Sequence, residues 1–408
     1  GGFSVRRYAL AGASLRGLTM YAKPLAERFR ESACLVGVFD PNPVRAEFVS
    51  RESGAPAFGD FDEMIRRAEP DCVIVATVDR YHHEYIIRAL EAGCDAITEK
   101  PLTIDDEKCR AILAAVGRTG RKVTVTFNYR FAPYATRVKE LLRAGVIGPV
   151  WSVDFEWLLD TRHGADYFRR WHRRKENSGG LLVHKATHHF DLVNWWLEDE
   201  PQRVFALGAR RLYGPGRRER GERCLTCPHA ATCEFYVDYA SDPLLRALYF
   251  EAEEVDGYFR DGCVFAGEID IEDTMSVTVG YRGGALLTYS LVAHSPYEGW
   301  RAALNGAEGR LELEEFHSGR FAGEPTQAIR WFNRRGEVVI YEISKVEGGH
   351  GGGDERLLER LFGGKEWADP LGHMADAWAG AMSVLIGVAA NRSIATGEAV
   401  AIGDLLKG

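Results

Sequence analysis

The chain has 408 residues, of which 46% are hydrophobic and 27% charged, and its formal net charge is −8. This length suits about two domains with a sizeable core, and the acidic balance disfavours nonspecific binding to nucleic acid or to an acidic membrane surface. Because no apolar run is long enough to cross a bilayer and no signal-peptide pattern opens the chain, we expect a cytoplasmic protein.

The first feature is a glycine-rich turn after a short strand at residues 5–11. The turn, Gly12-Ala13-Ser14-Leu15-Arg16-Gly17, is a G-x-S-x-x-G version of the dinucleotide fingerprint. Gly12 permits the tight turn, Gly17 lets the next helix pack closely, and Ser14 is small enough for backbone to approach a pyrophosphate. We expect a cofactor to contact Gly12, Ser14, Leu15, Arg16 and Gly17.

A second strand, at residues 34–39, ends in Asp40, which lies 23 residues after Gly17. That spacing is typical of the carboxylate that binds a ribose 2′-hydroxyl, so NAD is favoured over NADP. Arg45 keeps NADP open as an alternative, and Asp40 could instead be an ordinary turn residue before Pro41.

Two further strands end in polar residues. Residues 71–76 lead into Thr77, which we expect beside the cofactor, and a strand at 94–97 precedes Glu99-Lys100-Pro101. Alternation of strands and helices through residue 127 predicts a parallel, doubly wound sheet in a first domain at 1–127. A lysine at the carboxyl edge of such a sheet is placed to meet a ligand. The alternative is a solvated Glu-Lys pair on a loop.

The second domain, residues 128–408, shows another pattern. Alternating apolar residues at 150–157, 274–291, 310–314 and 328–332 predict an α/β domain with a large open, mostly antiparallel sheet. One face would point to the active site and the other to a partner subunit. We expect a polar insertion at about 213–265, a mobile glycine-rich loop at 348–353, and helices at 134–143 and about 371–391, the last packed against the first domain.

A histidine cluster follows Gly179-Gly180. On one helix, His184, His188 and Asp191 would share a face. Histidine is suited to proton transfer near neutral pH, although such spacing could also bind a metal or be ordinary polarity at a helix start. Lys185, Thr187 and His189 lie beside this set.

Five arginines crowd the segment before this cluster: Arg162, Arg169, Arg170, Arg173 and Arg174. Arginine forks match carboxylates, sulfonates and phosphates, so the segment predicts a pocket for an anionic sugar, with Tyr167 and Trp171 stacking on its ring. The alternative is a solvated loop or a subunit contact.

Cys224, Cys227 and Cys233 form a C-x2-C-x5-C pattern inside the polar insertion. With Cys263 or His229 as a fourth ligand, they could hold a structural zinc or an iron–sulfur centre. The alternative is a set of free thiols in a reducing compartment.

Taken together, these motifs resemble the Gfo/Idh/MocA family, the glucose–fructose oxidoreductase and inositol dehydrogenase group, over essentially the whole chain. The resemblance is carried by the turn at 12–17, Thr77 with His82, the motif at 99–101, Asn128-Tyr129-Arg130, the run at 179–191 and the segment 395–400. It implies a Rossmann domain, a nicotinamide cofactor contacted also by His82, Glu99 and Asn128, and a homodimer or homotetramer.

The resemblance further implies that Lys100 touches substrate and nicotinamide, that His188 is the catalytic histidine and that Arg130 helps to bind the substrate. One position departs from the family pattern, because His184 stands where an aspartate usually precedes the catalytic histidine.

Three functions remain open at this point. The first is an NAD-dependent sugar dehydrogenase, with C3 favoured as the oxidised carbon and His184 and Lys185 assisting Lys100 and His188. The second is an NAD-dependent glycosidase that oxidises C3 transiently, eliminates the aglycone, adds water and reduces the ketone again. The third is a sugar or NAD sensor without catalysis.

Overall fold

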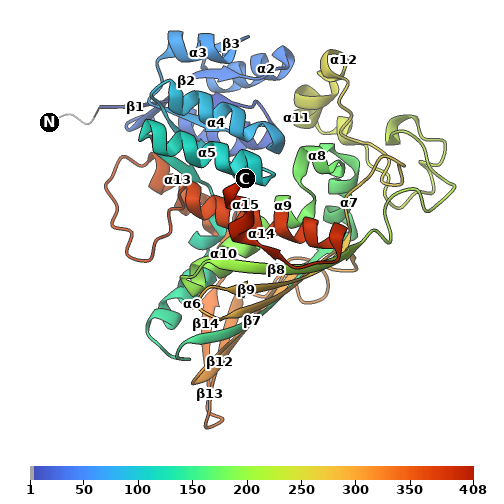
Figure 1. The fold of residues 1–408 in the computed structure, drawn as a ribbon. Coiled ribbons are helices and arrows are strands. Elements are labelled where there is room, and N and C mark those ends of the chain that lie inside the picture. The colour runs from blue at the N-terminus through green and yellow to red at the C-terminus, as the bar shows by residue number, and fades with distance from the viewer. Residues whose placement is uncertain (1–3) are drawn as a thin grey trace.

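The computed structural model describes residues 4–408 and contains two β-sheets linked by helices (Figure 1). The first sheet is parallel, with strand order β3-β2-β1-β4-β5-β6. Its strands are β1 Arg6–Ala11, β2 Ala33–Phe39, β3 Ala57–Phe58, β4 Cys72–Val75, β5 Asp95–Thr98 and β6 Val123–Val125. This is the expected doubly wound arrangement, in which the strand order reverses at β1 and β4.

Helices cover both faces of this sheet, so its central strands are buried; all four residues of β4 are inaccessible. They are α1 Lys23–Glu27, α2 Pro43–Ser53, α3 Phe61–Ala68, α4 His82–Glu91 and α5 Asp106–Thr119. Local sequence sets their ends. The side chain of Asp105 accepts a hydrogen bond from the Lys108 amide at the start of α5, and Gly120 ends that helix in a left-handed conformation.

The second sheet has nine strands in the order β14-β13-β12-β11-β7-β10-β9-β8-β15, and only the β7–β10 pair is parallel. Its strands are β7 Val150–Asp160, β8 Pro201–Ala209, β9 Thr274–Tyr281, β10 Leu286–Ser295, β11 Gly299–Gly306, β12 Gly309–Phe316, β13 Thr326–Asn333, β14 Val338–Ser344 and β15 Val400–Ala401. The mostly antiparallel sheet is confirmed. The apolar run at 274–291 is a hairpin of β9 and β10, because Gly283 and Gly284 turn the chain.

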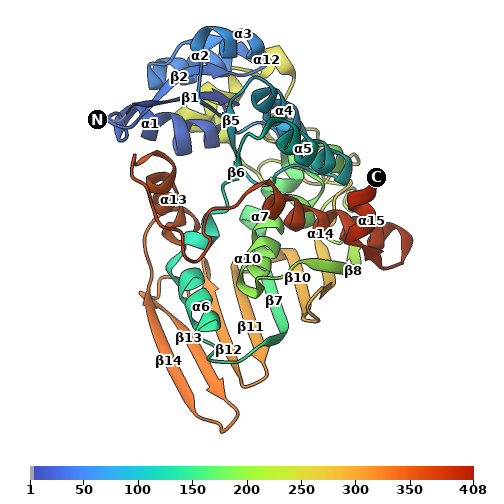
Figure 2. The ribbon, with the colours of Figure 1, turned by 60° about the vertical axis from the view of Figure 1, so that its left-hand side comes forward.

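In this half of the chain the helices are α6 Pro133–Arg143, α7 Thr161–Arg169, α8 Lys175–Ser178, α9 Leu181–His184, α10 Thr187–Leu197, α11 Pro243–Leu245, α12 Glu253–Asp256, α13 Gly353–Phe362, α14 Ala377–Thr396 and α15 Ile402–Lys407. Helices α6, α7, α10 and α14 lie on one face of the nine-stranded sheet (Figure 2). Along β7, Phe155 and Trp157 point into this packed layer, whereas Asp154 and Glu156 point to the open face.

The C-terminal helix joins the two halves. α14 is almost entirely buried and packs against α5, β6, β8 and α10, so it fills the space between the two sheets (Figure 2). It begins six residues later than expected, because Asp376 caps its first turn by accepting from the Ala379 amide, and it ends at Gly397.

No helix over residues 4–408 has the length and apolar character needed to traverse a membrane.

Candidate active site

The glycine-rich turn has the geometry needed to approach a dinucleotide. Gly12 has a φ of +108°, and a Cβ at this position would lie 2.5 Å from the carbonyl group of Ala76, so only glycine fits. The hydroxyl of Ser14 donates to the Ala76 carbonyl oxygen and accepts from the Gly17 amide. Ser14 therefore closes the turn itself, and the approach to a phosphate is left to backbone amides.

Asp40 lies at the end of β2, where the sequence placed it. Its carboxylate accepts the amide hydrogens of Ala13, at 2.9 Å, and Asn42, at 2.8 Å. Burial raises the pKa of Asp40, and the nearby charge of Arg45 opposes that rise. Arg45 is itself bound to Asp256, at 2.5 Å. Both carboxylates hold Arg45 through Nε and Nη2, whereas its Nη1 is buried without a hydrogen-bond partner. These residues fit the adenosine ribose of a dinucleotide, with the Asp40 carboxylate in the place expected for a ribose partner.

Other residues of the expected cofactor set are held mainly by the protein. Both ring nitrogens of His82 lie within 3.0 Å of carbonyl oxygens, those of Pro101 and Thr77, so His82 ties two strand ends together. The hydroxyl of Thr77 donates to the Val78 carbonyl oxygen.

Arg16 and Glu99 form a salt bridge at 2.9 Å beneath the turn. Arg16 also reaches Asp354, and Glu99 accepts from the hydroxyl of Tyr21. The side-chain nitrogen of Asn128 donates to Asp354 and lies 2.9 Å from Nδ1 of His350, and its side-chain oxygen is buried without a partner. Among these residues, Asn128 alone keeps a buried polar atom for another molecule.

Lys100 lies just beyond β5, at the carboxyl edge of the parallel sheet. Its ammonium group donates to the carbonyl oxygen of His184, at 2.8 Å. Burial and the positive charge of Lys185 lower the pKa of Lys100 to about 7, while Asp79 and Glu99 oppose the shift. A lysine with a pKa near neutrality can give and take a proton under physiological conditions.

His184 does not share a helix face with His188 as the spacing suggested, because the chain breaks into α9 and α10 at Lys185 and Ala186. Instead, Nδ1 of His184 lies 2.5 Å from Oδ2 of Asp79, which follows Thr77 in the first half of the chain. Burial and the charge of Lys100 keep the pKa of His184 well below its usual value. Asp79 thus supplies the carboxylate that the histidine cluster itself lacks.

His188 is 1% exposed, and neither of its ring nitrogens has a hydrogen-bond partner among the described residues. Burial is the main cause that lowers the pKa of His188, and the positive charge of Lys100 lowers it further. The imidazole is therefore neutral. Its ring packs edge-on against Tyr129, at 4.7 Å, and lies 5.1 Å from the ring of His350. A buried neutral imidazole with two unused nitrogens is placed to exchange a proton with a ligand.

Three neighbours of His188 have different surroundings. The ammonium group of Lys185 lies 5.1 Å from the Trp157 ring centre, and burial lowers the pKa of Lys185. His189 stacks on Trp157 at 3.9 Å and bonds the hydroxyl of Tyr289, so it faces the nine-stranded sheet. Thr187, predicted to bind substrate, is completely buried and bonds Ser383 of α14, because its position in α10 faces that helix.

The arginines of residues 162–174 differ in whether their side chains already have partners within the protein. Arg162 is exposed, Arg169 bonds Asp166 and the Phe235 carbonyl oxygen, and Arg173 pairs with Glu268. Arg174, also predicted to bind substrate, bonds the Glu268 carbonyl oxygen. Only Arg170 combines a salt bridge, to Asp166, with a buried Nε that lacks a partner.

The aromatic residues of this segment do line the histidine cluster. Trp171 stacks on His172 at 3.6 Å, and the ring of His172 lies 4.4 Å from that of His184. The ring of Tyr167 lies 5.5 Å from His184, and its hydroxyl bonds His163.

Arg130 is not available to a substrate in this arrangement. It forms a buried bidentate salt bridge with Asp191, at 2.6 and 2.8 Å, and donates to the Gly372 carbonyl oxygen. Arg130 was predicted to help bind the substrate, and Asp191 to share a helix face with His184 and His188. They instead fasten α10 to the segment after β6.

The glycine-rich loop at 348–353 contributes to the site. His350 adopts a left-handed conformation, with φ of 54°, which places its ring against His188 and Tyr129. Asp354 accepts from His350 at 3.0 Å and anchors it. Sequence reasoning missed Asp79, His350 and Asp354; a histidine inside a glycine run was the one visible signal.

The cysteines of the insertion lie around one cavity, but their side chains are not arranged as the ligands of a metal ion. Cys224, Cys227, Cys233 and Cys263 line one small cavity of about 20 Å³. In residues 4–408, no group of three or more His, Cys, Asp or Glu side chains is arranged to hold a metal ion, and all eight cysteines are free thiols. Arg217 donates to Cys233 at 3.1 Å, an interaction the cysteine spacing could not reveal.

A Rossmann-type turn, a lysine at the sheet edge and a buried neutral histidine define the class of nicotinamide-dependent oxidoreductases. The chain matches the model of the family described as "Oxidoreductase family, NAD-binding Rossmann fold" over residues 6–127 and that of its "C-terminal alpha/beta domain" over 139–402. The protein therefore belongs to the Gfo/Idh/MocA oxidoreductase family, as its motifs predicted.

Individual relatives agree with this assignment. The chain is 40% identical to YteT of Bacillus subtilis, described as an oxidoreductase, over 99% of each chain. It is 28% identical to the D-glucoside 3-dehydrogenase of Escherichia coli over 40% of this chain and 46% of that one. The WlbA dehydrogenase of Bordetella pertussis superposes with a TM-score of 0.67 at 18% identity over 98% of this chain and 99% of that one, which shows a shared fold.

Proposed function

We propose that this oxidoreductase is an NAD-dependent sugar dehydrogenase that oxidises a secondary hydroxyl group, with C3 of the sugar as the favoured carbon. The observation that carries the proposal is the burial of Lys100, whose pKa is about 7, near enough to the neutral imidazole of His188 for its charge to lower the pKa of that histidine. The similarity to a glucoside 3-dehydrogenase supports C3. Residues 1–127 would bind the cofactor and residues 128–408 the substrate.

The cofactor, when bound, accepts the hydride from the sugar carbon. Side chains of the protein remove the proton of the sugar hydroxyl group. His188 accepts the hydroxyl proton through one of its two unused ring nitrogens, and Lys100, whose pKa is about 7, exchanges that proton with its surroundings. The buried Asp79–His184 pair lies beside Lys100, and its carboxylate favours the charged ammonium. Burial of these groups also keeps water away from the reacting carbon.

NADH absorbance tests this proposal directly. Purified protein is incubated with added NAD and a panel of free sugars, aryl glycosides and their uronic acid counterparts. The proposal expects NADH to accumulate with at least one sugar. Absence of NADH together with absence of aglycone release across the panel would leave a sensor role and contradict a catalytic one.

A redox-neutral glycosidase is the second candidate, and the surplus of proton carriers favours it. After oxidation at C3 the C2 proton is acidic, so a base removes it while the aglycone leaves C1; water then adds and the ketone is reduced again. His184, Lys185 and His350 all lie near Lys100 and His188 and could serve these added steps. This candidate predicts aglycone release without net NADH.

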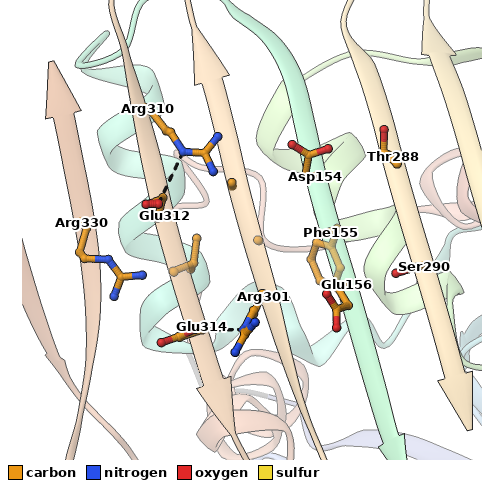
Figure 3. Close-up of a pocket in the computed structure, with 13 residues that line it drawn as sticks. Asp154, Phe155, Glu156, Thr288, Ser290, Arg301, Arg310, Glu312, Glu314 and Arg330 are labelled. Carbon is orange, nitrogen blue, oxygen red and sulfur yellow. Dashed lines mark ion pairs between the residues drawn. The ribbon is translucent and has the colours of Figure 1, made fainter. Parts of the chain in front are cut away.

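We also propose that a second copy of the chain covers the open face of the nine-stranded sheet. A pocket of about 400 Å³ there is lined by alternating charges, among them Asp154, Glu156, Arg301, Glu312 and Arg330 (Figure 3). Such a mixed surface is self-complementary about a twofold axis. Light scattering should give a dimer or tetramer, and Arg301→Glu should yield smaller species; an unchanged mass would refute this interface.

Metal binding by the insertion cysteines stays a prediction, as does a cytoplasmic location. Elemental analysis of purified protein tests the first: about one equivalent of zinc per chain, or about two or four equivalents of iron with matching sulfide, lost in Cys227→Ser, would support it. A metal-free, fully active protein would refute it.

A further inference from the structure

The insertion between β8 and β9 lies directly on the cofactor half of the molecule. The Leu15 amide, within the glycine-rich turn, donates to the hydroxyl of Tyr249 at 2.9 Å. The side chain of Asn42, which caps α2, donates to the Ala252 carbonyl oxygen at 3.0 Å and to Asp256 at 2.9 Å. Figure 1 shows α11 and α12 of this insertion beside the parallel sheet's layer. The insertion therefore borders the place where a cofactor's phosphates would lie.

Two arginines behind this contact lie close enough for the charge of one to act on the other. Arg260, from the insertion, stacks on Tyr249 at 4.3 Å and is 8% exposed. Arg170 lies at the end of α7, and burial, together with the positive charge of Arg260, lowers its pKa. The two segments are in tight contact, since a Cβ at Gly262 would lie 2.5 Å from the Arg169 carbonyl oxygen.

Of these two arginines, Arg170 pairs with a carboxylate, that of Asp166, at 3.0 Å. Nε of Arg170 and Nε of Arg260 are both buried without a hydrogen-bond partner, and among residues 4–408 no carboxylate lies within ion-pairing distance of Arg260. The Tyr258 hydroxyl and Nδ1 of His172 are likewise buried and unpartnered. A buried donor without an acceptor destabilises a folded chain, so two guanidinium Nε donors left in this way point to an anionic ligand.

We propose that Arg170 and Arg260, with the hydroxyl of Tyr258, form a binding site for an oxyanion where the insertion meets the cofactor turn. Two sources share this chemistry: the diphosphate of the dinucleotide and the carboxylate or sulfonate of a sugar. The hydrogen bond between Tyr249 and Leu15 places the site beside the glycine-rich turn that would bind the diphosphate. His172, whose ring packs against that of His184, links the site to the catalytic groups. The identity of these ligands rests on the proposed function.

The test compares Arg260→Gln with Arg174→Gln in the full-length chain. Arg174 belongs to the same arginine-rich segment but bonds the Glu268 carbonyl oxygen, so it serves as the matched control. Calorimetry measures binding of NAD, inorganic pyrophosphate, phenyl glucoside and phenyl glucuronide. These are binding measurements, so they decide the proposal even if the enzyme proves inactive on every sugar tried.

If the site holds the diphosphate, Arg260→Gln weakens NAD and pyrophosphate by about tenfold or more, the usual effect of losing a charge-assisted hydrogen bond. If it holds the sugar's acid group, NAD is unaffected and the glucuronide loses its advantage over the glucoside. Without ligand, the variant should melt no lower than the parent, because an unpaired buried charge has been removed.

The proposal is overturned if all four affinities are unchanged, or if glucoside and glucuronide weaken equally while NAD does not. A lower melting temperature with unchanged affinities would make Arg260 purely structural. Should Arg260→Gln fail to fold, Tyr258→Phe removes only a hydroxyl group and is judged by the same four affinities.

Discussion

The pKa of Lys100 provides the sharpest quantitative prediction, through its neighbour Lys185. After burial, the positive charge of Lys185 is the largest cause of the low pKa of Lys100, about 7. Lys185→Met keeps an unbranched side chain of similar length over Trp157 but removes the charge. Without this repulsion the protonated form of Lys100 is less disfavoured, so its pKa must rise.

Coulomb's law gives the size of the shift. For two unit charges about 10 Å apart at an effective dielectric constant of about 20, the interaction is about 1.7 kcal/mol, or roughly 1.2 pKa units. Oxidation needs Lys100 unprotonated, so kcat/KM rises with pH through this pKa. The acid limb should therefore move from about pH 7 in the parent to about pH 8 in the variant, an upward shift of about one unit.

The assay is the pH profile of kcat/KM for the best sugar, measured from NADH formation at saturating NAD. Lys175→Met is the control, because Lys175 pairs with Glu272 and does not act on Lys100. Its profile should match that of the parent. An acid limb that stays in place or moves down in Lys185→Met would show that Lys100 does not set the pH dependence.

Further predictions concern single residues. Lys100→Ala and His188→Ala should each lower turnover by at least about two orders of magnitude while NAD binding survives, and near-normal kcat in either would disprove its role. His350→Ala should lower kcat with little effect on NAD affinity, because its ring packs on His188; equal losses in both would point to a structural role. Gly12→Ala should abolish NAD binding in calorimetry, since its Cβ would lie 2.5 Å from the Ala76 carbonyl. NAD should bind at least about tenfold more tightly than NADP because Asp40 repels a 2′-phosphate; equal affinities would refute this.

Local sequence was a good guide to the parallel sheet and to the ends of its strands. The strand ending at Asp40 and the one before Lys100 lie where alternation and spacing placed them, because those signals are encoded within a few residues. The break between α9 and α10 was not visible, since polar and apolar residues alike are buried on nearly every face of α10 and no glycine or proline marks the break.

The composition of the site depended on contacts between distant segments. The sequence alone allowed Arg130 to be interpreted as a substrate ligand. In the structure, its guanidinium group is bound by Asp191, 61 residues away. Asp79 bonds His184 across 105 residues, and the charge of Arg260 acts on Arg170 from an insertion with little regular structure. Spacing rules describe neighbours along one helix or strand and carry no signal for such pairs.

The central claim, hydride transfer between a sugar carbon and the nicotinamide, is tested most directly by isotope transfer. A glucoside carrying deuterium at C3 is incubated with the enzyme and NAD, and cofactor and sugar are analysed by mass spectrometry. The account predicts deuterium in the reduced cofactor, either accumulating or, in a redox-neutral cycle, appearing transiently in a single turnover. If deuterium never reaches the cofactor from C3, while a label at another carbon does, the assignment of C3 is wrong; if no labelled carbon delivers it, hydride transfer itself is contradicted.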